Sequence, residues 1–191
     1  MTALDRSFSW LGRFPLAVDV ADTVRVVGSE KVDLLADEAN LSNWISHEVE
    51  RFPLADSARG RLKTFRGLRD AVRDVLIAHA DRRQPHARAI SKINEASARC
   101  PTYPKMEAGG RVRVVGVNHD LYDAFCALVA RSTIEVVSGP DREDLAVCHA
   151  PSCGMPFVRQ HGRRRWCSDA CGNRARVARH TARAAPRDGT S

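Results

Sequence analysis

The sequence predicts an α+β protein with a mostly helical N-terminal domain, a small β-hairpin within that domain, and a much smaller C-terminal module. Three observations lead to this fold class. Apolar residues recur at helical spacing over 58–79, and apolar and polar residues alternate over 111–117 as they do in a strand. Four of the six cysteines lie between positions 148 and 171, close to the C-terminus.

The N-terminal domain contains several segments with the apolar spacing of amphipathic helices. The clearest is 58–79, whose apolar face ends at His79, and we expect this histidine to pack against the core rather than to act in catalysis. The opposite face carries charges of both signs, which is typical of a solvated surface. Shorter helices are expected over 34–49, 87–94 and 121–137.

Other local signals place the ends of these helices and one hairpin. Asn40 or Ser42 is the expected cap of a helix in the segment 34–49. The strand over 111–117 is expected to pair with residues near 102–106 across a double glycine. The valine-rich stretch 18–27 is interrupted by charges and stays unassigned between helix and strand.

Charge divides the chain unevenly. Residues 1–147 carry 21 basic and 21 acidic side chains, whereas residues 148–187 carry nine arginines and one acid, Asp169, for a net charge of +8. This asymmetry favours a polyanionic partner for the C-terminal part and excludes a uniformly basic protein of the histone type. A linker-like stretch near 142 then divides the chain into a domain 1–141, a module 142–187 and a frayed tail 188–191.

The clustered cysteines form two close pairs separated by a loop, which is the arrangement that a tetrahedral metal ion needs. We expect no export signal and no membrane span, and therefore a reducing compartment in which clustered cysteines bind metal. One structural Zn²⁺ is the predicted cofactor, with no open position for chemistry. Free thiols, two disulfides, a [4Fe–4S] cluster, or His149 or His161 as a ligand remain alternatives. The predicted ligands are Cys148, Cys153, Cys167 and Cys171.

Residues around the ligands predict the shape of the module. Gly154 allows a sharp turn after the first pair, and the apolar stretch 155–158 is expected to form one arm of a hairpin. Ser168 is a suitable N-cap for a helix that carries Cys171 in its first turn. A knuckle, a hairpin and a helix bearing the last ligand make a small treble-clef-like zinc finger with four cysteine ligands. Trp166 is expected in its core.

Arginines give the module its charge and its predicted partner. Three are consecutive before Cys167, and Arg176, Arg179 and Arg183 fall within about 60° on one helix face. The guanidinium fork matches phosphate and the major-groove edge of guanine. For Asn173 a capping role, and for Arg174 a bracing role in the knuckle, remain open. The predicted nucleic-acid contacts are Arg163, Arg164, Arg165, Asn173, Arg174, Arg176, Arg179 and Arg183.

These residues resemble two known families. The stretch from Cys148 to Arg183, with Arg163-Arg-Arg-Trp-Cys167-Ser and Cys171-Gly-Asn-Arg174, resembles the CGNR zinc finger, a family named for this tetrapeptide. Residues 14–140 resemble the ABATE domain, a stress-induced transcription regulator, although Asp22 stands where that family often has asparagine. The motifs that carry this second resemblance are Leu16-Ala-Val-Asp19, Thr23, Asp33-Leu-Leu35, Leu41-Ser-Asn-Trp44, Leu68-Arg69 and Ile93-Asn94.

The resemblance implies a bacterial transcription regulator whose finger binds double-stranded DNA and whose N-terminal domain senses a small molecule. It is expected to be cytoplasmic and nucleoid-associated, with no membrane partner, and a homodimer is expected because many regulators read paired half-sites. An RNA-binding or ribosome-associated zinc protein is the alternative. A second alternative is an enzyme domain with Asp19 and Asp22 at a pocket. The sequence shows no nucleophile, phosphate-loop or dinucleotide motif, so we expect no enzyme.

Overall fold

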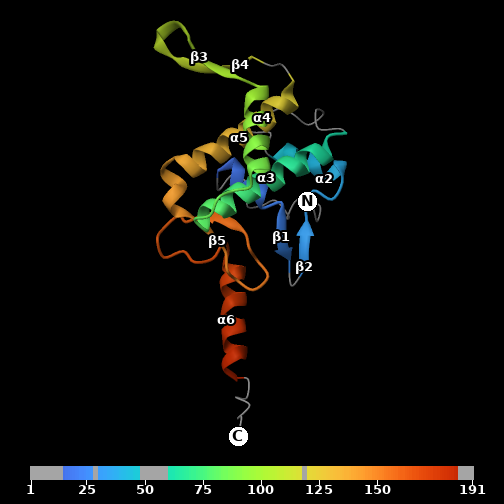
Figure 1. Ribbon diagram of the computed structural model, residues 1–191, viewed down its shortest axis with the longest axis vertical. Helices are drawn as coiled ribbons and strands as arrows, with labels where there is room; N and C mark the ends of the chain where they lie inside the picture. The colour runs from blue at the N-terminus through green and yellow to red at the C-terminus, as the bar shows by residue number, and fades with distance from the viewer. Residues whose placement is uncertain (1–14, 28–29, 48–59, 118–119, 185–191) are drawn as a thin grey trace.

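The structure is a computed structural model that describes residues 15–27, 30–47, 60–117 and 120–184 (Figure 1). Parts of two predicted helices, at Val49 and Ala58, and the predicted tail 188–191 lie outside these residues. The described chain is mostly helical with short antiparallel strands, which confirms the predicted α+β class. No helix within the described ranges combines the length and the apolarity needed to cross a bilayer.

Six helices and six strands make up this part of the chain. Each strand pairs with its neighbour in sequence, which gives three separate two-stranded antiparallel sheets. Short 3₁₀ turns, η2 (Ala108–Gly110) and η3 (Pro140–Asp144), link some of the elements. In chain order the main elements are α1 (Leu16–Ala21), β1 (Val24–Val27), β2 (Glu30–Asp33), α2 (Glu38–His47), α3 (Leu62–Ala80), α4 (Ala87–Arg99), β3 (Thr102–Met106), β4 (Val112–Gly116), α5 (Leu121–Ser138), β5 (Leu145–Val147), β6 (Pro156–Val158) and α6 (Asp169–Ala184).

The core of the helical body forms around α3, which follows the predicted apolar spacing. Its buried face includes Phe65 and packs against α1, α4 and α5. The rings of Trp44, Phe65 and Phe125 lie 5.6–5.9 Å apart in this core, so α2, α3 and α5 meet at an aromatic cluster. His79 is half-buried and its Nδ1 lies 3.0 Å from the carbonyl oxygen of Val75, as expected of a packed histidine.

The N-terminal part of the body differs from the prediction. Helix α2 begins at Glu38, and Asp37 Oδ1 accepts a hydrogen bond from the amide of Asn40 at 2.7 Å. The cap is therefore Asp37, and the predicted caps Asn40 and Ser42 lie inside the helix. The N-cap position of α2 lies three residues before Asn40, earlier than the apolar pattern indicated, so the side-chain acceptor for the free amides of its first turn is Asp37.

The unassigned stretch 18–27 divides into helix α1 and strand β1, and strand β2 after it was not predicted. Strand β2 has the sequence Glu-Lys-Val-Asp, which shows little apolar alternation. Its last residue, Asp33, is held by a bidentate ion pair with the buried Arg69 at 2.6 and 3.0 Å. A contact between residues 36 positions apart therefore anchors this hairpin, and local sequence does not reveal it.

The predicted hairpin between 102 and 117 is confirmed. Strands β3 and β4 pair in register from Thr102 opposite Gly116 to Met106 opposite Val112. Gly109 and Gly110 have φ values of +82° and +77°, which suit glycine, and they close the turn. This hairpin extends from the body at the end opposite α6 (Figure 1), and every residue of β3 is exposed.

The C-terminal module is attached firmly to the body. Leu145 on β5 and Val158 on β6 are buried in the same core as the body helices. Arg73 on α3 donates from Nη1 to the carbonyl oxygen of Ala21 at 2.6 Å and to Met155 Sδ at 3.7 Å. The predicted linker near 142 is the short turn η3, so the finger's hairpin packs directly on the helices. Beyond it, α6 projects away from the rest of the molecule (Figure 1).

Candidate metal centre and nucleic-acid interface

The first pair of cysteines lies on a tight turn between β5 and β6. The amide of Cys148 donates to the carbonyl oxygen of Met155 at 2.8 Å, and the amide of Gly154 donates back to the carbonyl oxygen of Cys148 at 3.0 Å. Gly154 has φ +65°, so the residue type that tolerates the left-handed region stands where the chain reverses. This geometry confirms the predicted knuckle and points both sulfurs toward the start of α6.

The second pair lies at the N-terminus of α6. The hydroxyl of Ser168 accepts a hydrogen bond from the amide of Cys171 at 3.3 Å, which confirms Ser168 as the cap. Cys171 is in the first turn of the helix and is buried, whereas Cys167 precedes the helix and is half-buried. The hairpin, the knuckle and the helix that carries the last ligand form the predicted treble-clef-like finger.

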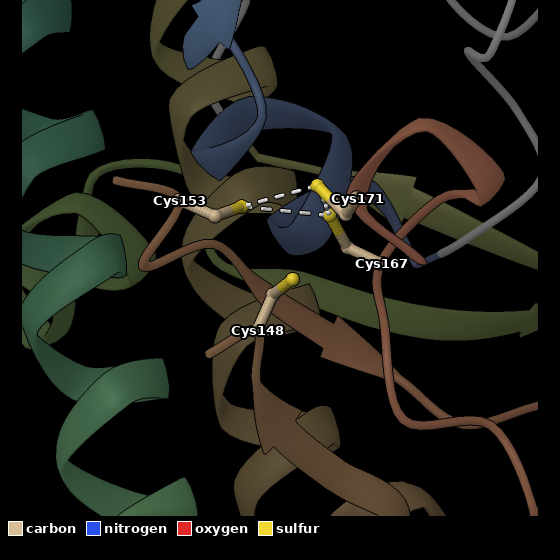
Figure 2. Close-up of side chains that lie close together, drawn as sticks. All are labelled: Cys148, Cys153, Cys167 and Cys171. Carbon is tan, nitrogen blue, oxygen red and sulfur yellow. Dashed lines mark hydrogen bonds between the residues drawn. The ribbon is translucent and has the colours of Figure 1, made fainter. Parts of the chain in front are cut away.

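The four cysteine side chains point toward a common space, with the sulfur of Cys148 facing the other three (Figure 2). The Sγ atom of Cys171 lies 3.5 Å from that of Cys167 and 3.6 Å from that of Cys153, and the Cys153–Cys167 distance is 3.7 Å. The ligand atoms of the whole group, including Cys148, lie within 4.8 Å of one another. Tetrahedral zinc with Zn–S bonds of about 2.3 Å requires sulfurs about 3.8 Å apart. The four cysteines therefore form a zinc-binding site.

The electrostatics of the cluster also favour a divalent cation. Hydrogen bonds from the thiols of Cys153 and Cys167 lower the pKa of Cys148. The same contacts raise the pKa values of Cys153 and Cys167, because a second and third negative charge next to the Cys148 thiolate is unfavourable. A zinc ion at the centre would compensate these charges, and a site closed by four sulfurs leaves no position for a substrate, so its role is structural.

The CGNR motif braces this centre. Arg174 donates from Nη2 to Cys171 Sγ at 3.1 Å, so its guanidinium group contacts a ligand sulfur directly. A Cβ atom added at Gly172 would lie 3.1 Å from Cδ1 of Trp166, which explains why the helix has glycine there. Trp166 packs on the small core of the finger with the half-buried cysteines, as expected. Of the two roles left open for Arg174, the structure supports the brace.

The three consecutive arginines have different environments. Arg164 is half-buried and donates to the carbonyl oxygens of Trp166 and Cys167, while its guanidinium group lies 5.6 Å from the ring centre of Phe157. It therefore fixes the loop. Arg163 and Arg165 on either side of it are exposed, in a loop that a hydrogen bond from the amide of Arg164 to the carbonyl oxygen of His161 closes at 3.0 Å.

The structure brings this arginine loop and the start of α6 around one hollow of about 630 Å³, which we call the basic hollow. Arg176 and Arg179 line it from the helix, so arginines more than ten positions apart in sequence face a common space. Asp169 is the one carboxylate among the described residues that line it. The loop arginines that line the same space are Arg163, Arg164 and Arg165.

The remaining predicted contacts lie on or near this surface. Arg183 is exposed further along α6 and does not line the basic hollow. Asn173 lies within helix α6 rather than at its end, and its exposed side chain accepts a hydrogen bond from Arg176 Nη2. The capping role considered for it is therefore wrong. The cap is Ser168, five positions earlier, because Asn173 already has four helical residues before it. His161 lines the basic hollow, and neither His149 nor His161 belongs to the metal cluster.

The carboxylates considered for catalysis lie near the contact between body and finger. Asp19 is fully buried, and burial raises the pKa of Asp22 to about 7 against the opposing charges of Arg25 and Arg73. The free cysteines Cys100 and Cys126 are buried as expected, and burial raises the pKa of Cys126 to about 11. A buried thiol with a raised pKa is a poor nucleophile.

Comparison with known families agrees with this geometry. Residues 15–140 match the ABATE family, described as a putative stress-induced transcription regulator. The chain belongs to the ABATE family. Residues 145–184 match the CGNR zinc finger. Both are regulator or zinc-finger families rather than enzyme families. A search of curated proteins found no match to the chain.

Proposed function

We propose that this ABATE protein is a bacterial transcription regulator that binds double-stranded DNA through its finger. The observation that carries the proposal is the basic hollow, where arginines from the loop and from α6 surround one space beside the metal centre. Duplex DNA carries one negative charge per about 1.7 Å of helix axis, so a compact group of guanidinium forks can contact several phosphates at once.

The proposed DNA contacts divide into direct and supporting residues. Arg163, Arg165, Arg176, Arg179 and Arg183 are exposed and can reach phosphates or base edges. Asn173 is exposed beside them and orients Arg176. Arg164 holds the loop and Arg174 holds a zinc ligand, so we propose that these two act on DNA binding through the structure of the finger.

The exposed helix α6 is the proposed reading element. It projects from the body (Figure 1). Its residues from Arg176 to Arg183 are all exposed, which leaves a free helix of a diameter that fits the major groove. Zinc holds the base of this helix, because Cys171 lies in its first turn. The finger would therefore present a rigid basic helix at a defined angle to the body.

Further parts of the proposal concern the rest of the chain. We propose that 1–141 senses a small molecule, that 142–187 is the DNA-binding unit, and that the protein acts in the cytoplasm in association with the nucleoid. A homodimer would read paired half-sites, and measurement of the molar mass in solution tests this. We propose no enzymatic activity.

Fluorescence anisotropy with labelled duplex DNA across a salt series tests the central proposal. Five phosphate contacts give a slope of log K against log salt of about −4.5, and replacement of one contact arginine by glutamine reduces it by about 0.9. Arg88→Gln, on α4, is the matched control because its exposed guanidinium lies outside the finger. DNA binding that is equal in wild type and in Arg176→Gln/Arg179→Gln would refute the proposed interface.

Competition with RNA that carries single-stranded loops separates the DNA proposal from the RNA alternative. Single-stranded RNA recognition uses exposed aromatic side chains for stacking, and the tryptophan at the basic hollow is half-buried in the core of the finger. We therefore expect duplex DNA to displace RNA at equal concentration. Preferential retention of RNA would favour the ribosome-associated alternative.

A further inference from the structure

A second hollow, of about 1020 Å³, lies where the helical body meets the finger's hairpin, and we call it the junction pocket. Helices α3, α4 and α5 line one side of it. Turn η3, Leu145 on β5 and Arg159 just after β6 line the other. Its volume is at the upper end of the range of small-molecule sites. The pocket is therefore formed jointly by the proposed sensor and the proposed DNA-binding unit.

The floor of the junction pocket is apolar and aliphatic. Val75, Ile93 and Leu145 supply buried surface from α3, α4 and β5. Ile90 and Ile134 stand at the same pocket with 42% and 39% of their surface exposed, although large apolar side chains on these helices are otherwise mostly buried. No phenylalanine, tyrosine or tryptophan is among the described residues that line the pocket, and His79 supplies its one aromatic ring. This floor suits an alkyl chain.

The rim of the junction pocket is strongly basic. Arg83 forms an ion pair with Asp74 at 3.6 Å, so its charge is partly compensated. The other three rim arginines are Arg82, Arg142 and Arg159. Among the residues that the structure describes, no carboxylate forms an ion pair with any of them. Glu143 is the one acid in the described lining. Such a rim favours an anionic head group over a neutral one.

Arg82 adds an independent observation. It follows the end of α3, where its amide donates to the carbonyl oxygen of His79 at 3.1 Å and the amide of Arg83 donates to that of Ala78 at 2.8 Å. These two bonds are those of a Schellman motif, whose left-handed position is usually glycine. Arg82 occupies it with φ +56°. An arginine in this position at a pocket rim, where glycine would fit without strain, favours a role for its side chain there.

We propose that the junction pocket binds a small amphipathic carboxylate, with its alkyl chain on the aliphatic floor and its carboxylate between the rim arginines. As effector of the regulator proposed above, such a ligand would link the helices to the hairpin that carries the first two zinc ligands. Because the ligand contacts both units, it favours one placement of the finger on the body. Effector and DNA then change each other's affinity by the same factor.

Octanoate is the probe, and isothermal titration of the zinc-loaded full-length protein without DNA is the measurement. We expect one site per chain and at least tenfold weaker binding of octanamide, which has the same chain but no charge. Arg142→Gln should weaken octanoate binding about tenfold. Arg88→Gln is the matched control, since this exposed arginine on α4 does not line the pocket, and it should bind octanoate as the wild type does.

Arg82→Gly separates binding from folding. Glycine suits the left-handed position, so this variant should show a higher midpoint of thermal unfolding together with about tenfold weaker octanoate binding. Absence of octanoate binding, equal binding of octanamide, or unchanged binding in both Arg82→Gly and Arg142→Gln would overturn the proposal. Loss of DNA binding in the salt series above would instead count against the proposed function, because the titration contains no DNA.

Discussion

Replacement of Cys167 by serine tests how zinc holds the finger together. The sulfur of Cys167 lies 3.7 Å from that of Cys153 and 3.5 Å from that of Cys171, so this residue connects the two ligand pairs. A structural zinc site contributes about 10–16 kcal/mol of apparent binding free energy. The finger's largest buried apolar side chains, Met155 and Phe157, contribute about 1.5–3 kcal/mol each. We therefore expect the knuckle and α6 to unfold in this variant.

The same substitution should also weaken the body. Leu145 and Val158 belong to the body core, with 5% and 8% of their surface exposed, and they lie on the hairpin that carries the knuckle. Complete detachment of the hairpin would cost about 1.5–3 kcal/mol for each of them. The expected loss in the free energy of unfolding is therefore about 3–6 kcal/mol, a large part of the stability of an ordinary domain.

Three measurements check this prediction. Colorimetric zinc release should fall from about one ion per chain to none, and circular dichroism should show the loss of α6. Urea unfolding in a Trp10→Phe/Trp166→Phe background, which leaves Trp44 as the one tryptophan of the chain, follows the body. Cys126→Ala, a buried cysteine outside the cluster, is the control and should keep its zinc. If Cys167→Ser retained tightly bound zinc and full helicity, the structural role of the metal would be wrong.

Three further predictions concern single contacts. Arg174→Met should weaken zinc affinity about 10–100-fold in a chelator competition, because the guanidinium group of Arg174 contacts a zinc ligand. The salt slope of DNA binding should stay unchanged within error. A reduced slope would show that Arg174 contacts phosphate. Asp33→Asn should lower the free energy of unfolding by about 2 kcal/mol at pH 7 in urea titrations, because it weakens the ion pair with buried Arg69. Burial acts to raise the pKa of Asp33, but the hydrogen bonds from Arg69 outweigh it and hold that pKa below 3.8. The wild type should therefore lose the stabilisation from this ion pair as the pH falls below about 4, whereas the variant should not. Gly154→Ala should lower the free energy of unfolding by about 1 kcal/mol, because a φ of +65° is unfavourable for a residue with a Cβ atom. An unchanged midpoint of thermal unfolding would contradict this prediction.

Features that depend on neighbours in sequence could be predicted from the sequence alone. The two cysteine pairs lie on short turns, so their spacing by itself indicates the metal ligands and the type of site. The apolar spacing of α3, α4 and α5 likewise predicts these helices, because one face of each must be buried. The uneven distribution of charge also identifies the finger as the basic part of the chain, since this requires only a count of charged residues along the sequence.

Features that depend on contacts between distant residues were decided only by the tertiary structure. Strand β2 is held by Arg69, which lies 36 positions from its partner Asp33. Arg164 and Arg174 share the sequence signature of the exposed arginines, but packing turns them toward the finger's own carbonyl oxygens and sulfur. The junction pocket is formed by five elements that no local pattern connects. Sequence determined which groups carry charge and bind metal, and the fold decided which of them face solvent, because burial depends on every segment that packs against a residue.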